Sequence, residues 1–222
     1  RVPAGADVLW TVRFLPDSAR SPTILLLVVG IIVALLTIAG QQSAHHPLAI
    51  LAELYVDLMR GIPMLVIILY VGFPLHGAIK DMTGGFIDMS SLTRGVVGIA
   101  LGYAAYMAEI FRAGIQAIPK GQVEASRSLG LSGWQTARFV VLPQALKIVI
   151  PPLGNEFIAM LKDTSLLSVI SLREMTQRTR EFMAATFEVF TPFNTVAILY
   201  IVMTLAASSL IKFVERRTEA EK

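Results

Sequence analysis

Long apolar stretches without a single Asp, Glu, Lys or Arg are the feature that most restricts how this chain can fold. They run from Pro22 to Gly40, from Gly61 to Ile79 and from Val189 to Ile211. An α-helix rises about 1.5 Å per residue, so about 20 such residues cross a hydrocarbon layer of about 30 Å. The three stretches therefore predict transmembrane helices.

Two further apolar regions carry a few charges. Gly95–Ile115 is interrupted late by Glu109 and Arg112, which lie three residues apart and can pair on one helix face. Phe139–Leu161 is the least regular of the five regions. Its interruptions are Pro143, Lys147, Pro151, Pro152 and Glu156. We expect an all-α, polytopic membrane protein with five transmembrane helices in one domain spanning residues 1–222, with its termini on opposite sides of the membrane.

The overall composition agrees with this class and excludes several functions. The chain is 55% hydrophobic and 16% charged, whereas soluble domains carry about a quarter charged residues. The net charge of +3 is explained by basic residues that flank the spans. The sequence has no Cys, three scattered His and no G-x-x-x-x-G-K-[ST] stretch. We therefore expect no bound metal, no bound cofactor or nucleotide, and no catalytic residue of an intramembrane enzyme.

A polar, punctuated segment separates the third and fourth apolar regions. It reads IPKGQVEASRSLGLSGWQTARFVVLPQAL, Ile118–Leu146. Pro119 suits the first position of a helix, and Gly130 suits the left-handed residue just past a helix end. Ser132 and Gln135 form a capping-box pattern for a second helix. The segment therefore predicts a rigid helix–bend–helix elbow on an aqueous face of the membrane.

Part of this segment, EASRSLGLSGWQTARFVVLP, resembles the EAA loop of ATP-binding-cassette (ABC) importer permeases. That loop has a Glu-Ala-Ala start, a Gly six residues after the Glu and a terminal Leu-Pro. The matching positions are Glu124, Ala125, Ser126 (in place of the second Ala), Gly130, Leu142 and Pro143. The stretches LMRGIPMLV, AAYMAEIFRAGIQAIPKGQ and LPQALKIVIPPLGNEFIAMLKDTSLLSVI are similar to the polar amino acid permeases of the histidine and glutamine type. The resemblance covers roughly Leu48–Ile211.

The resemblance implies a type I ABC importer fold and the role of a transmembrane permease subunit in polar amino acid uptake. It implies a coupling loop over about residues 118–143 that is cytoplasmic and docks on an ATPase subunit. The C-terminus would then lie inside the cell and the N-terminus outside, in the bacterial plasma (inner) membrane. Glu124 would pair with basic groups of the ATPase, and apolar neighbours would fill its groove. The implied coupling residues are Glu124, Ala125, Ser126, Arg127, Leu129 and Gly130.

The resemblance also implies partners. In that family two permease subunits, identical or homologous, join two ATPase chains and an extracellular or periplasmic substrate-binding protein. ATP and Mg²⁺ would be bound by the partner ATPase, and this chain would form the translocation pathway as a dimer. The alternative function is a passive channel or structural membrane subunit, which needs no docking elbow and whose activity is indifferent to ATP.

Polar groups near the fourth span are candidates for the substrate pathway, because ionisable groups inside a bilayer usually face a cavity or a partner. Pro151, Pro152 and Gly154 are expected to loosen the helix there. The ammonium of an amino acid needs an anionic partner, which Glu156 or Asp163 could supply. The residues of this hypothetical pathway, or of its outer gate, are Asn155, Glu156, Lys162, Asp163, Thr164, Ser165 and Tyr106. The alternative is that they only stabilise a helix break and a subunit interface.

Overall fold

The computed structural model of the protein describes residues 47–219, which form helices joined by short connections, with no β-strand in that range. The predicted span Pro22–Gly40 lies outside the described residues. Four helical runs in the described part are long and apolar enough to cross a bilayer. They are Met64–Met82, Ser91–Gln116, Gly133–Ile170 and Phe190–Arg217. These runs overlap the predicted second to fifth spans, so the all-α polytopic class is confirmed.

The chain enters the bundle through two helices separated by a break. Helix α2 (Pro47–Gly61) ends where Pro63 adopts an extended backbone, with ψ 137°, and α3 (Met64–Tyr70) follows directly. Pro63 lacks an N–H, so it is tolerated at the start of α3 but could not continue α2. An α-helix before this break was not predicted.

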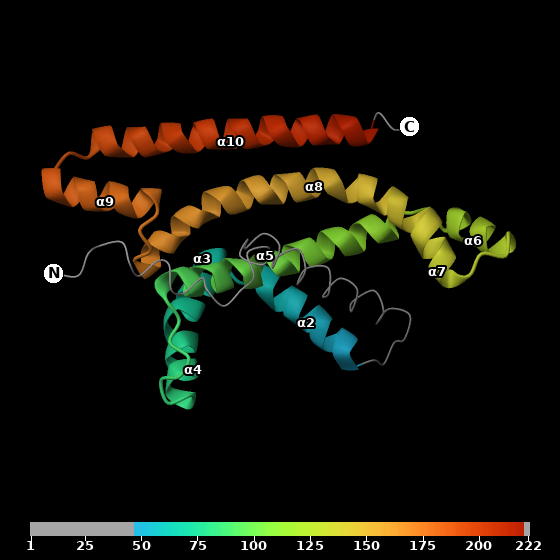
Figure 1. Cartoon of the computed structure of the whole chain (residues 1–222), viewed down its shortest axis with the longest axis horizontal. Coiled ribbons are helices and arrows are strands. Elements are labelled where there is room, and N and C mark those ends of the chain that lie inside the picture. Colours follow the sequence, from blue (N-terminus) through green and yellow to red (C-terminus); the bar gives the residue numbers. More distant parts are fainter. Residues whose placement is uncertain (1–46, 220–222) are drawn as a thin grey trace.

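The span predicted over Gly61–Ile79 corresponds to the helical run Met64–Met82, which is not a regular α-helix throughout. Beyond α3 the chain forms a π-helical turn at Val71–Leu75, which contains Pro74, and then α4 (His76–Met82). A proline removes a backbone donor, and a π-helical turn is one way for a helix to accommodate that loss with a kink. As a result α4 turns away from the other helices (Figure 1).

A tight turn connects α4 to the next helix. Gly84 and Gly85 both have positive φ, at 61° and 85°. The Asp88 carboxylate accepts a hydrogen bond of 2.7 Å from Lys80 Nζ and lies 3.2 Å from His76 Nε2. The hydrogen bond from Lys80 is the main reason that the pKa of Asp88 lies below its usual range. The connection is therefore held back against α4.

Helix α5 (Ser91–Gln116) is the centre of the bundle. Ser90 caps it by accepting a 3.2 Å hydrogen bond from the Thr93 backbone N–H. Small residues let neighbours approach closely: a Cβ added at Gly98 would lie 3.3 Å from the Ile68 Cα on α3. This is how α3 comes to pack along α5.

The elbow segment leads from α5 into the fourth span. It contains α6 (Lys120–Ser128) and α7 (Gly133–Thr136), followed by a π-helical turn at Ala137–Val141 and α8 (Leu142–Asp163). From here on we call residues 118–143 the elbow. The second short helix runs without a break into the span, as the sequence predicted.

The helix break expected around IPPLG is wrong. Helix α8 continues through Pro151 and Pro152, and it curves instead of breaking (Figure 1). A proline inside a helix removes one hydrogen bond and pushes away the preceding turn, so two adjacent prolines bend the axis. The change in geometry comes later, at a 3₁₀ turn over Thr164–Ile170 that ends at Ser171 with φ 60°.

Two helices complete the described chain. The first is α9 (Met175–Thr186), and the Glu174 carboxylate caps it by accepting from the backbone N–H groups of Thr176 and Gln177 at 2.7 and 2.6 Å. Helix α10 (Phe190–Glu219) then returns along the bundle. A carboxylate at a helix N-terminus accepts hydrogen bonds from the free N–H donors, and its negative charge interacts favourably with the helix dipole.

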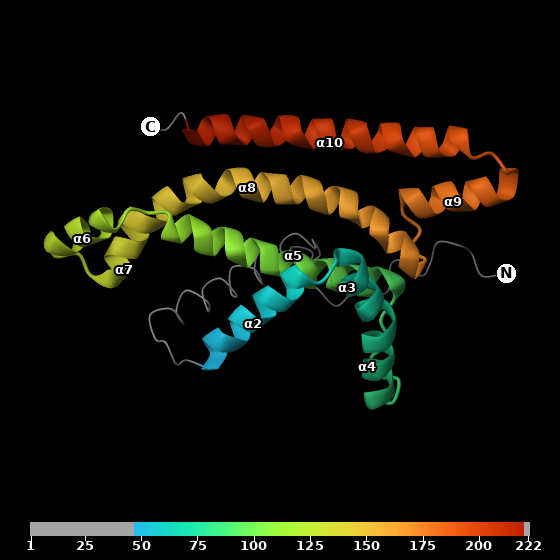
Figure 2. The same ribbon diagram turned by 180° about the vertical axis from the view of Figure 1, so that it is seen from behind.

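The long helices lie side by side in order. Helix α5 packs against α2 and α3 on one side and against α8 on the other, and α10 packs on α8 (Figure 1; Figure 2). The elbow projects from one end, and α9 lies at the opposite end. The main core lies near the α9 end, where α3, α5, α8 and the 3₁₀ turn meet. Its buried residues are Ile68, Ile99, Ala100, Tyr103, Met160, Leu167 and Ile170.

Near the elbow, α5 and α8 touch so closely that no side chain fits at Gly114. A Cβ there would lie 2.2 Å from Val149 Cγ1. We expect Gly114→Ala to destabilise the protein by about 1–3 kcal/mol, the usual cost of overpacking. The thermal unfolding midpoint of the detergent-purified protein measures this.

The matched control for this prediction is Gly77→Ala on α4, where an added Cβ meets nothing within 4 Å. The control should leave the midpoint unchanged or raise it slightly. Gly114→Ala combined with Val149→Ala should recover part of the loss. An unaltered midpoint for Gly114→Ala alone would contradict the close approach of the two helices.

Candidate functional site

The bend of the elbow is built around Gly130. Its φ is +82°, the left-handed region that glycine enters without strain. The Leu131 N–H donates to the Ser126 carbonyl at 3.2 Å, and the Gly130 N–H donates to the Arg127 carbonyl at 2.9 Å. These two bonds are a Schellman motif, which satisfies the last carbonyls of α6 and fixes the direction of the exit. The predicted role of Gly130 in ending this helix is confirmed.

The second half of the elbow begins with the predicted capping box, which is also confirmed. The Gln135 N–H donates to Ser132 Oγ at 3.3 Å, and the Ser132 N–H donates to Gln135 Oε1 at 2.8 Å. Pro119 lies one position earlier than predicted, because it precedes the first residue of α6 instead of occupying it. Both short helices thus have defined ends, which makes the elbow stiff.

Side chains also join α6 to α7. The Ser126 hydroxyl donates to the Val123 carbonyl at 2.7 Å and shares a 3.0 Å hydrogen bond with the Thr136 hydroxyl. A Cβ at Gly133 would lie 2.9 Å from an Arg127 guanidinium nitrogen, so Arg127 reaches across to α7. Ser126 is only 3% exposed. Its place in this chain is therefore inside the elbow, where a second alanine could not make these bonds.

The remaining predicted coupling residues lie on the surface. Glu124, Ala125, Arg127 and Gly130 are exposed, and Leu129 is 83% exposed. Leu129 therefore adds an apolar side chain to the otherwise polar surface of the elbow.

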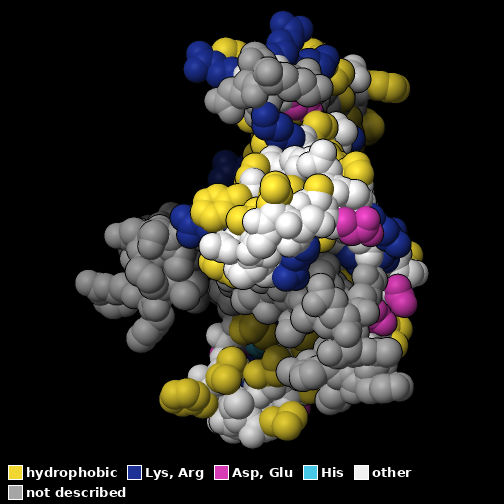
Figure 3. All heavy atoms as spheres, turned by 90° about the vertical axis from the view of Figure 1, so that its right-hand side faces the viewer, with side chains coloured by type: hydrophobic (Ala, Val, Ile, Leu, Met, Phe, Trp, Pro, Cys, Tyr) yellow, Lys and Arg dark blue, Asp and Glu magenta, His cyan; other side chains and the backbone are white. Residues whose placement is uncertain are grey.

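Sequence reasoning missed two members of this surface. Trp134 is 73% exposed and Phe139 is 64% exposed, and Arg138 lies over the Phe139 ring at 5.7 Å. The signal was present in the sequence, since a Trp in a short polar helix is unusual. Aromatic and Arg side chains are the groups that most often anchor protein interfaces. Figure 3 looks onto this end of the molecule, where apolar side chains lie beside Lys, Arg, Asp and Glu side chains.

A second group of predicted residues meets between α5 and α8. The Tyr103 hydroxyl donates to Asp163 Oδ2 at 2.9 Å, and the Tyr106 ring lies 6.0 Å from that of Tyr103. Glu156 lies two helical turns before Asp163 on α8 and interacts with its charge. Two partly buried carboxylates and two tyrosines therefore gather at one place inside the bundle, an arrangement suited to a cation.

Other predicted pathway residues do not join this group. Asn155 and Lys162 are exposed, whereas Thr164 and Ser165 are partly buried at the start of the 3₁₀ turn. The Thr164 hydroxyl donates to the Leu161 carbonyl at 2.7 Å, so it stabilises the helix end. Asn155 and Glu156 are neighbours in sequence and so point about 100° apart on the helix.

The predicted Glu109–Arg112 pair on α5 is confirmed, and it has a third member. Arg112 donates to both carboxylate oxygens of Glu109, with the Nε bond at 2.8 Å, and Arg60 of α2 lies 3.9 Å from the same carboxylate. These groups border a cavity of about 230 Å³ between α2 and α5. Its lining residues are Glu53, Val56, Asp57, Arg60, Ala108, Glu109 and Arg112. Within residues 47–219, no set of three His, Asp or Glu side chains is arranged to bind a metal ion.

A helical membrane bundle that carries polar groups inside it and a stiff elbow at one end is an architecture typical of membrane transport subunits. Residues 27–220 match the family described as the binding-protein-dependent transport system inner membrane component. The chain belongs to this family of inner-membrane ABC permease subunits.

Individual relatives agree with this assignment. The glutamine transport system permease protein GlnP of Escherichia coli is 36% identical over 191 residues, which are 86% of this chain and 83% of that protein. The probable amino-acid ABC transporter permease protein YckA of Bacillus subtilis is 35% identical over 86% of this chain and 79% of that protein. Both relatives are named as permeases, and neither name describes a passive channel.

Solved structures confirm the fold. The crystal structure of an amino acid ABC transporter with histidines has a chain that matches with a TM-score of 0.76 and 38% identity, over 88% of both chains. The MetNI methionine ABC transporter in an inward-facing conformation matches with a TM-score of 0.73 over 89% of both chains, at 20% identity, which shows the fold alone. The predicted type I ABC importer fold is therefore confirmed.

Proposed function

We propose that this permease carries polar amino acids into the cell, and that a partner ATPase drives it by docking on the elbow. The elbow is the observation that supports this most directly. Its backbone is fixed by a Schellman motif and a capping box, and it joins α5 to α8 without a flexible link. A push on such a rigid element moves the two helices that it connects.

The partner ATPase would meet the exposed side chains of the elbow. Leu129 and Trp134 supply apolar anchors, and Glu124 supplies a charge for basic groups of the partner. ATP and Mg²⁺ belong to that partner. In this proposal the elbow and the C-terminus lie on the cytoplasmic side of the membrane, and α9 lies on the outer side.

The substrate class follows from the relatives and from the carboxylate pair. The relatives named above serve glutamine and other amino acids. In this chain Asp163 and Glu156 would take the ammonium of an amino acid near Tyr103, which is buried. A second permease subunit completes the pathway, and an extracellular binding protein delivers the amino acid.

Reconstitution in lipid vesicles tests this function. The chain, copurified with its ATPase, should take up an amino acid only when ATP is present on the elbow side and the loaded binding protein is on the other side. ATP hydrolysis should rise with one or a few members of a panel of binding protein–amino acid complexes. Uptake that is indifferent to ATP would instead identify a passive channel.

A further inference from the structure

Helix α2 and helix α8 are attached to α5 in different ways. On the α8 side, a Cβ at Gly114 would lie 2.2 Å from Val149, and a Cβ at Gly154 would lie 2.3 Å from Ile211 of α10. These contacts leave no room for an added side chain, so α5, α8 and α10 are close-packed at these points.

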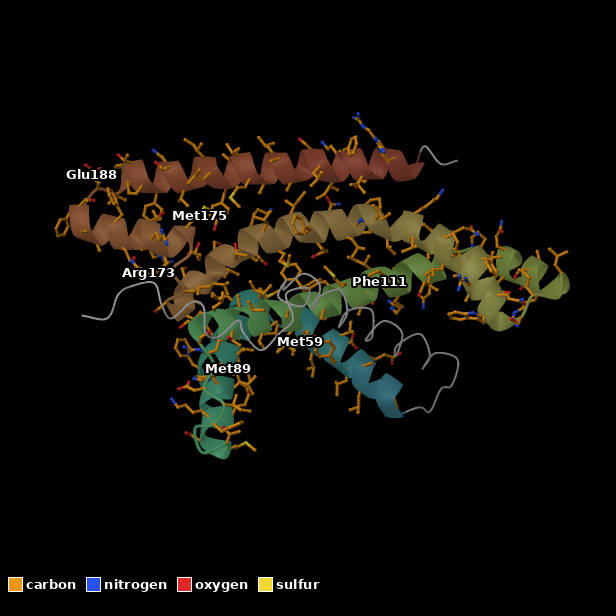
Figure 4. The ribbon with its side chains drawn as sticks, viewed as in Figure 1. Met59, Met89, Phe111, Arg173, Met175 and Glu188 are labelled. Carbon is orange, nitrogen blue, oxygen red and sulfur yellow. The ribbon has the colours of Figure 1, made fainter. Side chains whose placement is uncertain are left out.

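The seam between α2 and α5 is hollow by comparison. It borders the cavity of about 230 Å³, which is partly open to the surface and is lined largely by charged side chains. The contacts across it include the apolar contact of Val56 with Ala108, a 2.6 Å hydrogen bond from the Tyr55 hydroxyl to the Leu101 carbonyl, and the Arg60–Glu109 pair. Arg112 of α5 also interacts with the charges of Glu53 and Asp57 on α2. Figure 4 labels Met59 on α2 and Phe111 on α5, the two helices that lie on either side of the seam.

The Arg60–Glu109 pair occupies a particular position within the seam. Arg60 is the next-to-last residue of α2 and directly precedes the break before α3. Glu109 lies two turns before the end of α5, which continues into the elbow. Its side chain is one-quarter exposed and also pairs with Arg112 of its own helix. Replacing one partner of such a pair leaves the other charge without its counter-charge, so the pair can be tested from either side.

We propose that Glu109 is a positioning residue that holds α2 on α5 through Arg60. The pair transmits displacement of the elbow, carried by α5, to α2 and to the α2–α3 break. Without it, α2 lags behind the close-packed α5–α8–α10 unit, and ATP is hydrolysed without moving the substrate. This inference rests on the proposed docking of an ATPase at the elbow.

The test uses the complete transporter in vesicles, with its ATPase and binding protein, and measures ATP hydrolysed per amino acid taken up. Glu109→Gln keeps the side-chain shape and removes the charge. We expect uptake to fall about tenfold while ATP hydrolysis stays within about twofold. Arg60→Met should cause the same increase in ATP hydrolysed per amino acid taken up. Because the Arg60 side chain is 44% exposed, its replacement leaves the packing intact. Glu109→Asp keeps the charge and should behave nearly as the wild type does.

The control is Glu181→Gln on α9, which removes the exposed pair with Arg173, a residue that precedes this helix, and should leave the ratio unchanged. A merely structural role of Glu109 would lower uptake and hydrolysis together. A wild-type ratio in both Glu109→Gln and Arg60→Met would overturn the proposal.

A covalent rescue separates attachment from charge. The chain has no native Cys, so Val56→Cys with Ala108→Cys places one thiol pair across the seam. In the Glu109→Gln background, oxidation should restore the wild-type ratio and reduction should abolish the rescue. Formation of the disulfide without rescue contradicts the proposal. Absence of ATP-dependent uptake in the wild type would instead reject the proposed function itself.

Discussion

Gly130→Ala is expected to reduce ATP-driven uptake about tenfold while leaving the protein inserted in the membrane. Space is not the reason, because an added Cβ at Gly130 meets nothing within 4 Å. The reason is the φ of +82°, where an L-residue with a Cβ pays about 1–2 kcal/mol. The strain is relieved by straightening the Schellman bend, which redirects α6 and its exposed docking residues. Uptake and ATP hydrolysis by the reconstituted complex measure the effect.

The matched control lies in α6, the short helix that Gly130 follows. Gly121 is also open to solvent, but its φ is in the ordinary helical range, so Gly121→Ala should not weaken uptake. Equal behaviour of the two variants would show that the bend at Gly130 is not needed for coupling.

Asp163→Asn is expected to give the second large effect. If this carboxylate takes the substrate ammonium, removing its charge should lower uptake by about 30-fold or more, the range found when one partner of a desolvated charge pair is lost. Glu156→Gln should weaken uptake less and alter the preference among amino acids, because this group is farther from Tyr103. Initial rates with a panel of loaded binding proteins distinguish the two.

An exposed carboxylate provides the comparison for this experiment. Asp81→Asn on α4 makes the same chemical change on the surface and should transport normally. Tyr103→Phe removes only the 2.9 Å hydrogen bond to Asp163 and should have an intermediate effect. Normal uptake and unchanged preference in both Asp163→Asn and Glu156→Gln would leave these carboxylates only a structural role.

The sequence predicted the elbow in detail because its geometry depends on short-range contacts. Gly130 and the Ser132–Gln135 capping box act over three to five residues, and their side chains carry the signal themselves. The spans were likewise predictable, since the length of an uncharged run decides whether it can cross a bilayer.

The remaining features of the fold and of the candidate site depend on contacts between residues that are distant in the chain, and a single sequence does not reveal such contacts. Tyr103 and Asp163 are 60 residues apart, and Arg60 reaches a carboxylate on another helix. The expected break at Pro151 and Pro152 failed for the same reason, because packing of α8 between α5 and α10 maintains the helix there. Ser126 reads as a conservative replacement in sequence, and only the fold shows its hydrogen bond to Thr136.

The π-helical turn at Ala137–Val141 has an angular consequence for the elbow. Such a turn accommodates one more residue than an α-helical turn, and each residue of an α-helix corresponds to a rotation of about 100°. The turn therefore sets the rotational phase between the membrane-embedded part of the fourth span and the end that leads into the elbow. This rotation determines the direction in which the exposed side chains of the elbow point. The orientation of the proposed docking surface therefore depends on residues that lie several positions away from it.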